Sequence, residues 1–261
     1  EKIPRGVELV AHGISGHGSI PLKSNAVVHL AAAVGKIGEW RPDIKLNETT
    51  GTYFRRLATI PTATPEQAKA YRGVLSPDPR SARAADDWLL ENEPRHDSML
   101  RTSVSPNIIQ GGYRSNVIPS EAKATLDVRM VPDEDPAEFL ERVKQIVNDP
   151  AVDVQFTGTR ASERPTNAQA KLDSEAFKAI ESAVTKIYGA VTLPTMSTGA
   201  TDMAQLRSHG VQCFGIGPAV DMEDGPKGFG AHSDQERLLE SELYRFVRFN
   251  WEVVSALAAA R

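Results

Sequence analysis

Four short stretches of the chain combine glycine with polar side chains in a way that a hydrophobic core does not require: residues 12–21, 114–119, 197–202 and 228–237. His17 stands between Gly16 and Gly18, whose missing side chains leave the imidazole free to project from a loop. His232 follows Gly-Phe-Gly-Ala and precedes Ser-Asp-Gln-Glu, so it could bind a metal while a nearby carboxylate holds its second ring nitrogen. These four stretches are the candidate functional sites of the chain.

Several of these residues also have an ordinary structural explanation. His17 could be a surface loop histidine, and one histidine such as His232 does not by itself define a metal site. His12 and His17 lie five residues apart in a glycine-rich loop, which is not the i, i+4 spacing of a helical zinc pair. Asp202 could simply N-cap the helix that follows it. We expect no special role for the remaining histidines: His29, inside a helix, and His96 and His209, in solvated segments.

Composition limits the class of protein to which the chain can belong. Its 261 residues lie near the size at which chains divide into two cores, and 40% hydrophobic with 25% charged residues is typical of a globular protein. A net charge of −4 and the lack of a long Lys/Arg block argue against nucleic acid as a partner. No run of eighteen apolar residues is present, which predicts a soluble chain with no membrane contact, either cytoplasmic or exported. The single cysteine, Cys213, is predicted to be a small buried apolar side chain.

The first part of the chain has the pattern of a split βαβ domain. Strands are expected at 7–10, 102–110, 122–130 and 152–156, and helices at 25–37 and 136–147. Between them, residues 41–100 are punctuated by prolines and suggest a helical excursion with short helices at 65–71 and 80–90. We therefore predict, for residues 1–158, an α+β domain with an antiparallel sheet and helices on one face.

After residue 160 the composition becomes polar, which indicates a domain boundary, so that residues 159–261 form a second unit. Helices are expected at 174–188, 202–208 and 241–259, with short strands at 191–196 and 211–216. This alternation is that of an incomplete α/β segment, because a parallel sheet needs more strands than two. We expect the rest of that sheet to lie outside these 261 residues.

The motifs and their order resemble the zinc-dependent metallopeptidase family M20, of the carboxypeptidase G2, aminoacylase-1, succinyl-diaminopimelate desuccinylase and Gly-X carboxypeptidase type. The motifs that carry the resemblance are Gly-His-Gly-Ser-Ile-Pro at 16–21, Asn-Val-Ile-Pro at 116–119, Asp-Val-Arg at 127–129, Gly-Ala-Thr-Asp at 199–202, and His232 with Glu236. The resemblance extends over nearly the whole chain but covers only the later part of the family pattern. It implies a lid that dimerises through edge strands and helices, inserted into a catalytic domain.

The resemblance also implies roles for single residues. His232 would be the last ligand of a pair of zinc ions, whose other ligands precede the lid and are not in this sequence. His17 would reach across a homodimer to stabilise the oxyanion in the partner's site, with Asn116 assisting. Arg129 would clamp the free carboxylate of the substrate through its two-pronged guanidinium. The turn that contains Ser197, Gly199 and Thr201 would offer backbone N–H groups to the same carboxylate.

Taken together, the residues and the resemblance predict the C-terminal part of a dinuclear zinc amidohydrolase. In its full-length form it would hydrolyse a peptide or an N-acyl amino acid next to a free carboxylate, while the fragment alone would be inactive. One alternative is a non-enzymatic dimerisation or binding module of split βαβ type. Another is a metal-independent hydrolase with Ser197 or Ser19 as nucleophile, although neither serine lies in a Gly-x-Ser-x-Gly elbow. The acyl group and the side chain of the substrate stay open.

Overall fold

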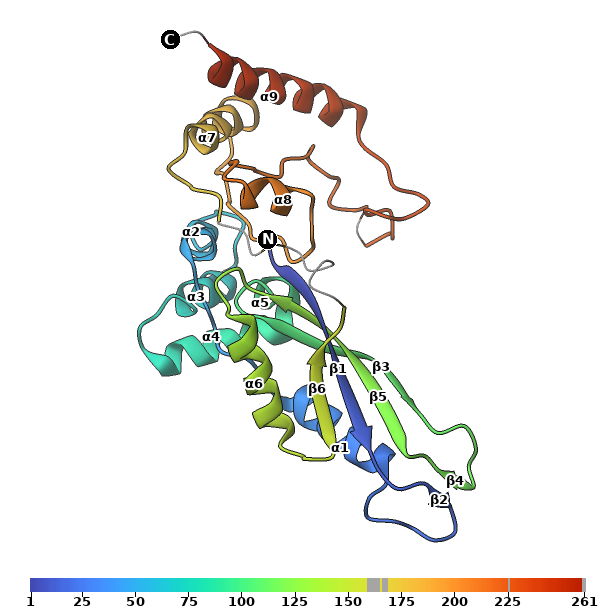
Figure 1. Cartoon of the computed structure of the whole chain (residues 1–261). Coiled ribbons are helices and arrows are strands. Elements are labelled where there is room, and N and C mark those ends of the chain that lie inside the picture. The colour runs from blue at the N-terminus through green and yellow to red at the C-terminus, as the bar shows by residue number, and fades with distance from the viewer. Residues whose placement is uncertain (159–164, 166–168, 225, 260–261) are drawn as a thin grey trace.

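The computed structural model describes residues 1–158, 165, 169–224 and 226–259. An antiparallel sheet occupies one end of the molecule and the C-terminal helices the other, with a group of short helices beside their junction (Figure 1). The strands are β1 (Ile3–His12), β2 (Gly16–His17), β3 (Ser103–Gly111), β4 (Val117–Ile118), β5 (Glu121–Met130) and β6 (Val152–Phe156). The helices are α1 (Ala26–Glu39), α2 (Glu48–Leu57), α3 (Pro65–Gly73), α4 (Pro79–Asn92), α5 (Pro94–Asp97), α6 (Pro136–Val147), α7 (Glu175–Tyr188), α8 (Met203–Ser208) and α9 (Glu240–Ala258).

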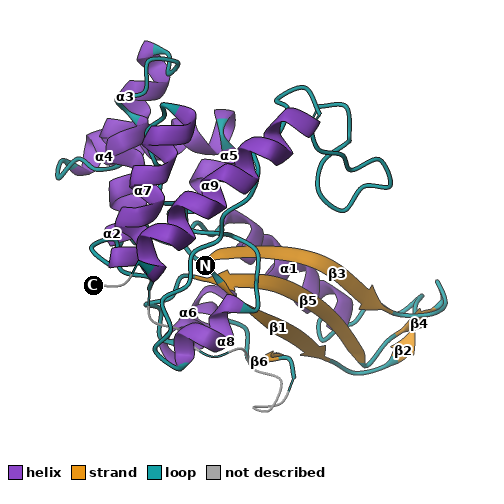
Figure 2. Cartoon of the chain, turned by 90° about the horizontal axis from the view of Figure 1, so that it is seen from above, coloured by secondary structure: helices purple, strands orange, loops and turns teal. Residues whose placement is uncertain are grey.

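The main sheet has the strand order β3-β5-β1-β6, and all its neighbouring strands are antiparallel. Every second residue of β5 from Ala122 to Met130 is buried, because side chains alternate between the two faces of a strand. Helices α1 and α6 cover this buried face and contribute Leu30, Ile37 and Phe139 to its core. Figure 2 shows α1 lying against one face of the sheet. The alternate residues of β5, which belong to the other face, are polar and are exposed or partly exposed. The predicted antiparallel sheet with helices on one face is therefore confirmed.

Local signals in the sequence explain where the two covering helices begin. The side chain of Asn25 accepts a hydrogen bond from the Val27 N–H at 3.0 Å and caps α1. The side chain of Asp135 likewise accepts from two N–H groups in the first turn of α6, and Pro136 opens that helix. An oxygen acceptor at the N-cap satisfies N–H groups that lack a partner inside the helix.

Residues 41–100, predicted as a helical excursion, contain α2 to α5 and have a core of their own. Phe54, Leu89 and Leu100 are fully buried in this core. Helix α2 was not predicted separately, although its Asn47 and Thr50 form a capping box that marks its start. Lys45 joins the excursion to the sheet domain through an ion pair of 2.7 Å with the buried carboxylate of Glu134.

His96 is not in a solvated segment, as its sequence context suggested, but in a half-buried polar cluster within the excursion. Its ring lies 2.9 Å from the Tyr53 hydroxyl and 2.5 Å from the Glu93 carboxylate, which also accepts hydrogen bonds from Gln67 and Tyr71. The partners come from three helices or their ends, so local sequence gave no sign of the cluster. Burial by itself raises the pKa of Glu93, but the hydrogen bonds from Gln67, His96 and Tyr71 outweigh it and hold that pKa below its ordinary value.

The C-terminal part contains α7, α8 and α9 as predicted, but the two predicted strands are absent from the residues described. Residues 191–196 and 211–216 are extended or irregular chain, and Val211 and Ile216 are about half exposed. A strand needs a neighbour to pair with its backbone groups. Here the Thr192 carbonyl accepts instead from the Arg56 guanidinium at 2.8 Å. The predicted boundary near residue 160 lies outside the described residues, and the division at 158/159 stays a prediction.

No helix in the described part of the chain combines the length and the hydropathy that crossing a bilayer requires. Cys213, predicted to be buried, is partly exposed, and its thiol lies 3.6 Å from the Val211 carbonyl.

We expect the substitution Glu93→Gln to lower the free energy of unfolding by about 2 kcal/mol, because it removes the charge that several half-buried donors share. Glu91→Gln on the exposed side of α4 is the matched control and should be neutral. Urea unfolding followed by circular dichroism measures both. Equal stability of the two variants would contradict the cluster's structural role.

A second expectation concerns acid stability. The His29 ring lies 2.6 Å from the Asp149 carboxylate and ties α1 to the turn before β6. The hydrogen bond with His29, followed by one from the Ala151 N–H, holds the pKa of Asp149 below its usual 3.8. The stabilisation is therefore present above that usual pKa and is lost as the pH falls through the lowered value in the folded state.

Asp149→Asn should accordingly cost about 1 kcal/mol at neutral pH and less in strong acid. The control is Asp153→Asn, because the His12–Asp153 pair at 3.1 Å is exposed, with side chains 52% and 73% accessible. Thermal unfolding at pH 7 and pH 3 compares the two. A cost at Asp149 that does not change with pH would count against the pair.

Candidate active site

His17 and Asn116 come together at the far end of the sheet, on a short two-stranded ladder. His17 pairs with Val117, and the Gly18 N–H donates to the Asn116 carbonyl at 2.8 Å. A Cβ atom on Gly18 would lie 3.1 Å from the backbone of Asn116, so the absence of a side chain permits this close approach. Both predicted oxyanion residues are exposed and are held next to each other by backbone bonds.

The Nδ1 atom of His17 lies 2.7 Å from the Ser19 hydroxyl, which is the geometry of a serine and a base. The contact is local, since the Ser19 N–H also points at the same nitrogen at 3.2 Å. Among the described residues no carboxylate contacts the second ring nitrogen of His17, whereas a catalytic triad needs such a group to orient the base. This arrangement does not favour Ser19 as a nucleophile.

Arg129 lies on β5 near the opposite end of the sheet, on the face that α1 and α6 do not cover. It stands in register with Pro4 and Ser103 on the neighbouring strands. Its guanidinium binds the Asp127 carboxylate with two hydrogen bonds, Nε to Oδ1 at 2.7 Å and Nη2 to Oδ2 at 3.0 Å. About a third of the arginine side chain is exposed, so a ligand can reach it. Asp127 belongs to the Asp-Val-Arg motif, but the sequence predicted a role for Arg129 alone.

The predicted carboxylate-binding turn at Ser197, Gly199 and Thr201 lies against the beginning of β1. The Lys2 N–H donates to the Ser197 carbonyl at 2.8 Å. Thr201 donates through its N–H and its hydroxyl to the carboxylate of Glu1, so this turn does bind a carboxylate, supplied here by the chain itself. A Cβ on Gly199 would meet only the Ser197 hydroxyl, at 3.7 Å, so the turn is open at this point.

Asp202 occupies the N-cap position of α8 but makes no side-chain capping bond there. The simple capping explanation is therefore not supported. The buried Arg207 from the same helix lies 3.5 Å from the Glu1 carboxylate, a contact that sequence reasoning missed because the partner is far away in the chain. A cavity of about 520 Å³ borders Ser197, Thr201 and Arg207, with Phe177 and Phe214 among its apolar walls.

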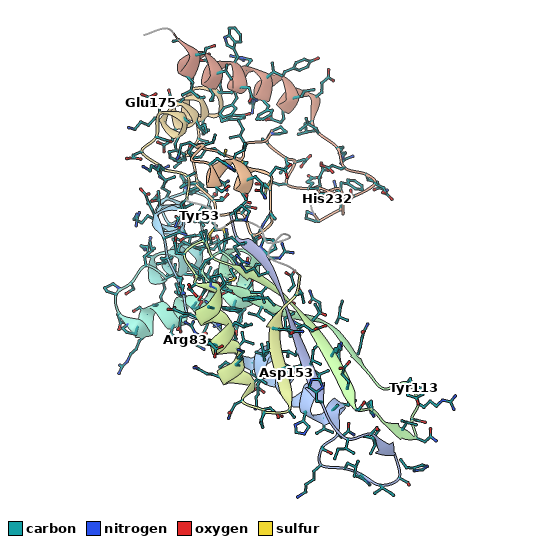
Figure 3. The ribbon with its side chains drawn as sticks, in the orientation of Figure 1. Tyr53, Arg83, Tyr113, Asp153, Glu175 and His232 are labelled. Carbon is teal, nitrogen blue, oxygen red and sulfur yellow. The ribbon has the colours of Figure 1, made fainter. Side chains whose placement is uncertain are left out.

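His232 lies in the long loop before α9, and its backbone adopts the left-handed conformation with φ of 70° (Figure 3). The expected carboxylate is present, but Glu236 accepts from the His232 backbone N–H at 3.0 Å rather than from the ring. The imidazole is exposed. Arg237 braces the loop by binding Asp224 at 2.6 Å and by lying over the Phe229 ring.

The predicted site residues thus form two groups at opposite ends of β1. Arg129 pairs with Pro4 near the start of this strand, and Ser197 contacts Lys2 just before it, whereas His17 and Asn116 lie beyond its end. A strand of ten residues spans about 30 Å at the usual rise per residue. His232 likewise lies well away from Tyr113 at the hairpin end (Figure 3). One copy of the chain does not bring all the predicted residues to one place.

Comparison with known proteins identifies the sheet domain. The model of the peptidase dimerisation domain of the M20 family matches residues 4–155. A probable carboxypeptidase S-like protein 2 of Dictyostelium discoideum is 27% identical over 209 residues, covering 77% of this chain and 37% of that protein. The human N-fatty-acyl-amino acid synthase/hydrolase PM20D1 is 27% identical over 212 residues, with 77% and 39% covered. Human aminoacylase-1 is 28% identical over 170 residues, with 65% and 40% covered.

Among solved structures, the M20 metallo-carboxypeptidase Sso-CP2 of Sulfolobus solfataricus shares the fold with a TM-score of 0.59 at 18% identity. The alignment covers 98% of this chain and 58% of that one. The chain spans about two fifths of the length of the curated relatives it matches. Because the family model covers more than half of its residues, the chain belongs to the M20 peptidase family, as a part that contains the dimerisation domain.

Proposed function

We propose that residues 1–158 are the dimerisation lid, and residues 159–261 the closing catalytic segment, of a zinc-dependent amidohydrolase. The full-length protein would hydrolyse a peptide or an N-acyl amino acid next to a free carboxylate. The observation that carries this proposal is the separation of the candidate residues into two groups at opposite ends of β1. Two complementary half-sites on one chain are what a composite active site in a symmetric dimer requires.

His17 and Asn116 would act in the partner's active site. An exposed imidazole and a side-chain amide on a backbone-paired hairpin are donors whose positions are fixed before the reaction. Donors of this kind stabilise the oxyanion that develops when an amide carbonyl is attacked. The edge strand β3 supports pairing of two copies, because it carries the exposed apolar residues Ile108 and Ile109 on its outer part.

Arg129 and the turn at 197–201 would bind the carboxylate of the substrate in the chain's own site. The guanidinium offers a planar pair of donors suited to a carboxylate. The contact of Thr201 with Glu1 supports the same role for the turn, because its N–H and hydroxyl already donate to the two oxygens of a carboxylate. Relatives named as carboxypeptidases, aminoacylases and N-acyl amino acid hydrolases favour a substrate with such a group.

The described residues do not fit a zinc site by themselves. Among them no group of three or more His, Cys, Asp or Glu side chains could hold a metal ion. A catalytic zinc needs three protein ligands and an open position, and His232 would supply one. We propose that the remaining ligands lie outside this sequence, and we derive no catalytic step through a metal from these residues.

The composite site predicts complementation between two inactive variants of the full-length protein. His17→Ala removes a donor to the partner's site, and Arg129→Ala removes the carboxylate clamp of the chain's own site. Each variant should lose most activity. A refolded or co-expressed mixture should recover about one quarter of the wild-type activity, because half the dimers are mixed and each mixed dimer contains one intact site of two. Hydrolysis of N-acetyl amino acids measures this recovery.

The control for His17 is His12→Ala, which removes an exposed histidine whose ring lies 3.1 Å from the Asp153 carboxylate. This variant should keep full activity. No recovery in the mixture would contradict the composite site. Full activity of both single variants would show that neither residue takes part in hydrolysis, as expected if this domain serves only dimerisation or binding.

Metal content provides a separate expectation. The full-length protein should retain about two zinc ions per chain after desalting, and His232→Ala should lower that content, whereas the 261-residue chain alone should hold no tight pair. His209→Ala is the matched control, since that ring contacts the Gln205 carbonyl on the surface. Elemental analysis makes the measurement. Two tightly held ions on the 261-residue chain would overturn our placement of the ligands.

A further inference from the structure

The Arg129–Asp127 pair differs from an ordinary surface ion pair in its geometry. The two residues stand two positions apart on β5, so both side chains project from the open face of the sheet. The carboxylate engages the guanidinium through two parallel bonds of 2.7 and 3.0 Å. A bidentate pair fixes the plane of the guanidinium as well as its position, which a single contact does not.

The two bonds leave one edge of the guanidinium for a ligand. Asp127 takes the Nε and Nη2 atoms, and no bond to Nη1 from another described residue is seen. A guanidinium has five N–H donors, and the ones left over still form a fork that matches a second carboxylate. The carboxylate of Asp127 therefore orients Arg129 without using up its binding capacity.

A second cation, Lys2, lies near the Arg129 guanidinium. Lys2, almost fully buried, donates from Nζ to the Ser103 hydroxyl at 3.1 Å, and Ser103 stands in register with Arg129. Burial above all, opposed by Asp97 and aided by Arg101 and Arg129, lowers the pKa of Lys2 to about 8. Lys2 and Arg129 therefore repel each other, and the two bonds from Arg129 to Asp127 oppose this repulsion.

We propose that Asp127 is a positioning residue that holds the Arg129 guanidinium in the orientation in which its free edge meets the substrate carboxylate. This inference rests on the proposed function, in which Arg129 binds that carboxylate. Asp127 does not itself touch the substrate. Its contribution is to the binding of substrates that carry a free carboxylate, and not to the reaction at the amide.

The test uses the full-length protein with the N-acetyl amino acid that it hydrolyses fastest, and with the C-terminal amide of the same compound. Asp127→Ala should raise KM for the acid about tenfold, with kcat nearly unchanged, because binding of the carboxylate is lost equally in the ground state and the transition state. KM for the amide should not change. Asp127→Asn keeps one acceptor for the guanidinium and should have a smaller effect of the same kind.

Ser105→Ala is the matched control. Ser105 pairs with Asp127 from the neighbouring strand, but its hydroxyl contacts Asn107 instead of the guanidinium. This variant should behave as wild type with both substrates. Equal changes for the acid and the amide in Asp127→Ala would indicate a merely structural role and would overturn the inference. If that variant does not fold, Asp127→Asn decides: a KM raised for the acid alone supports positioning, and an unchanged KM refutes it.

Arg129→Ala separates the inference from the proposed function. If this variant loses the preference for the acid over the amide while Asp127→Ala keeps it, Arg129 binds the carboxylate and Asp127 does not position it. If Arg129→Ala keeps the preference, the proposed role of Arg129 itself fails. The two failures therefore give different patterns in one set of four variants and two substrates.

Discussion

The pairing of β1 with β5 over ten consecutive positions is the constraint on which the rest of the structure depends. Every buried side chain under α1 and α6 takes its place from this register, because a shift by one residue would turn the apolar set outward. The same register fixes the positions of both groups of candidate residues. Arg129 is placed near the first residues of β1, and the chain that leaves its last residue, His12, leads directly to His17. The sheet therefore keeps the two groups of candidate residues apart by about the length of β1.

The helical excursion provides the second constraint, because it contacts both the sheet and the C-terminal part. Lys45 binds Glu134 beside the sheet, while Arg56 binds Glu181 of α7 at 2.6 Å and the Thr192 carbonyl at 2.8 Å. Met196, next to the carboxylate-binding turn, is buried in the core of the excursion. The position of that turn relative to Arg129 thus depends on packing of the excursion as well as on the contacts of Lys2 and Glu1. Helices α2 to α5, inserted between α1 and β3, therefore join the sheet domain to the C-terminal part of the chain.

Much of this fold could be predicted from the sequence, because periodicity and capping are local. The strands and helices of the sheet domain, the excursion and the last helices follow from patterns within ten to fifteen residues. The two-residue ladder at His17 is too short to produce a period, and the cluster around His96 joins residues from separate helices. The predicted strands at 191–196 and 211–216 failed for another reason, since apolar character alone does not supply backbone partners. The order of the motifs predicted the family, but the roles of the individual residues remain proposals.

The contrast between Arg129 and His232 shows what a strand and a loop can each contribute to a site. Arg129 is fixed by the ladder on both sides and by Asp127, so its geometry is complete within this chain. His232 has a left-handed backbone held by Glu236, yet its ring has no partner among the described residues. A binding residue on a sheet is preorganised by folding, whereas a lone imidazole on a loop gains its orientation only from the other ligands of an ion. Within the described residues the Arg129 guanidinium is therefore oriented by folding alone, whereas the His232 ring is not.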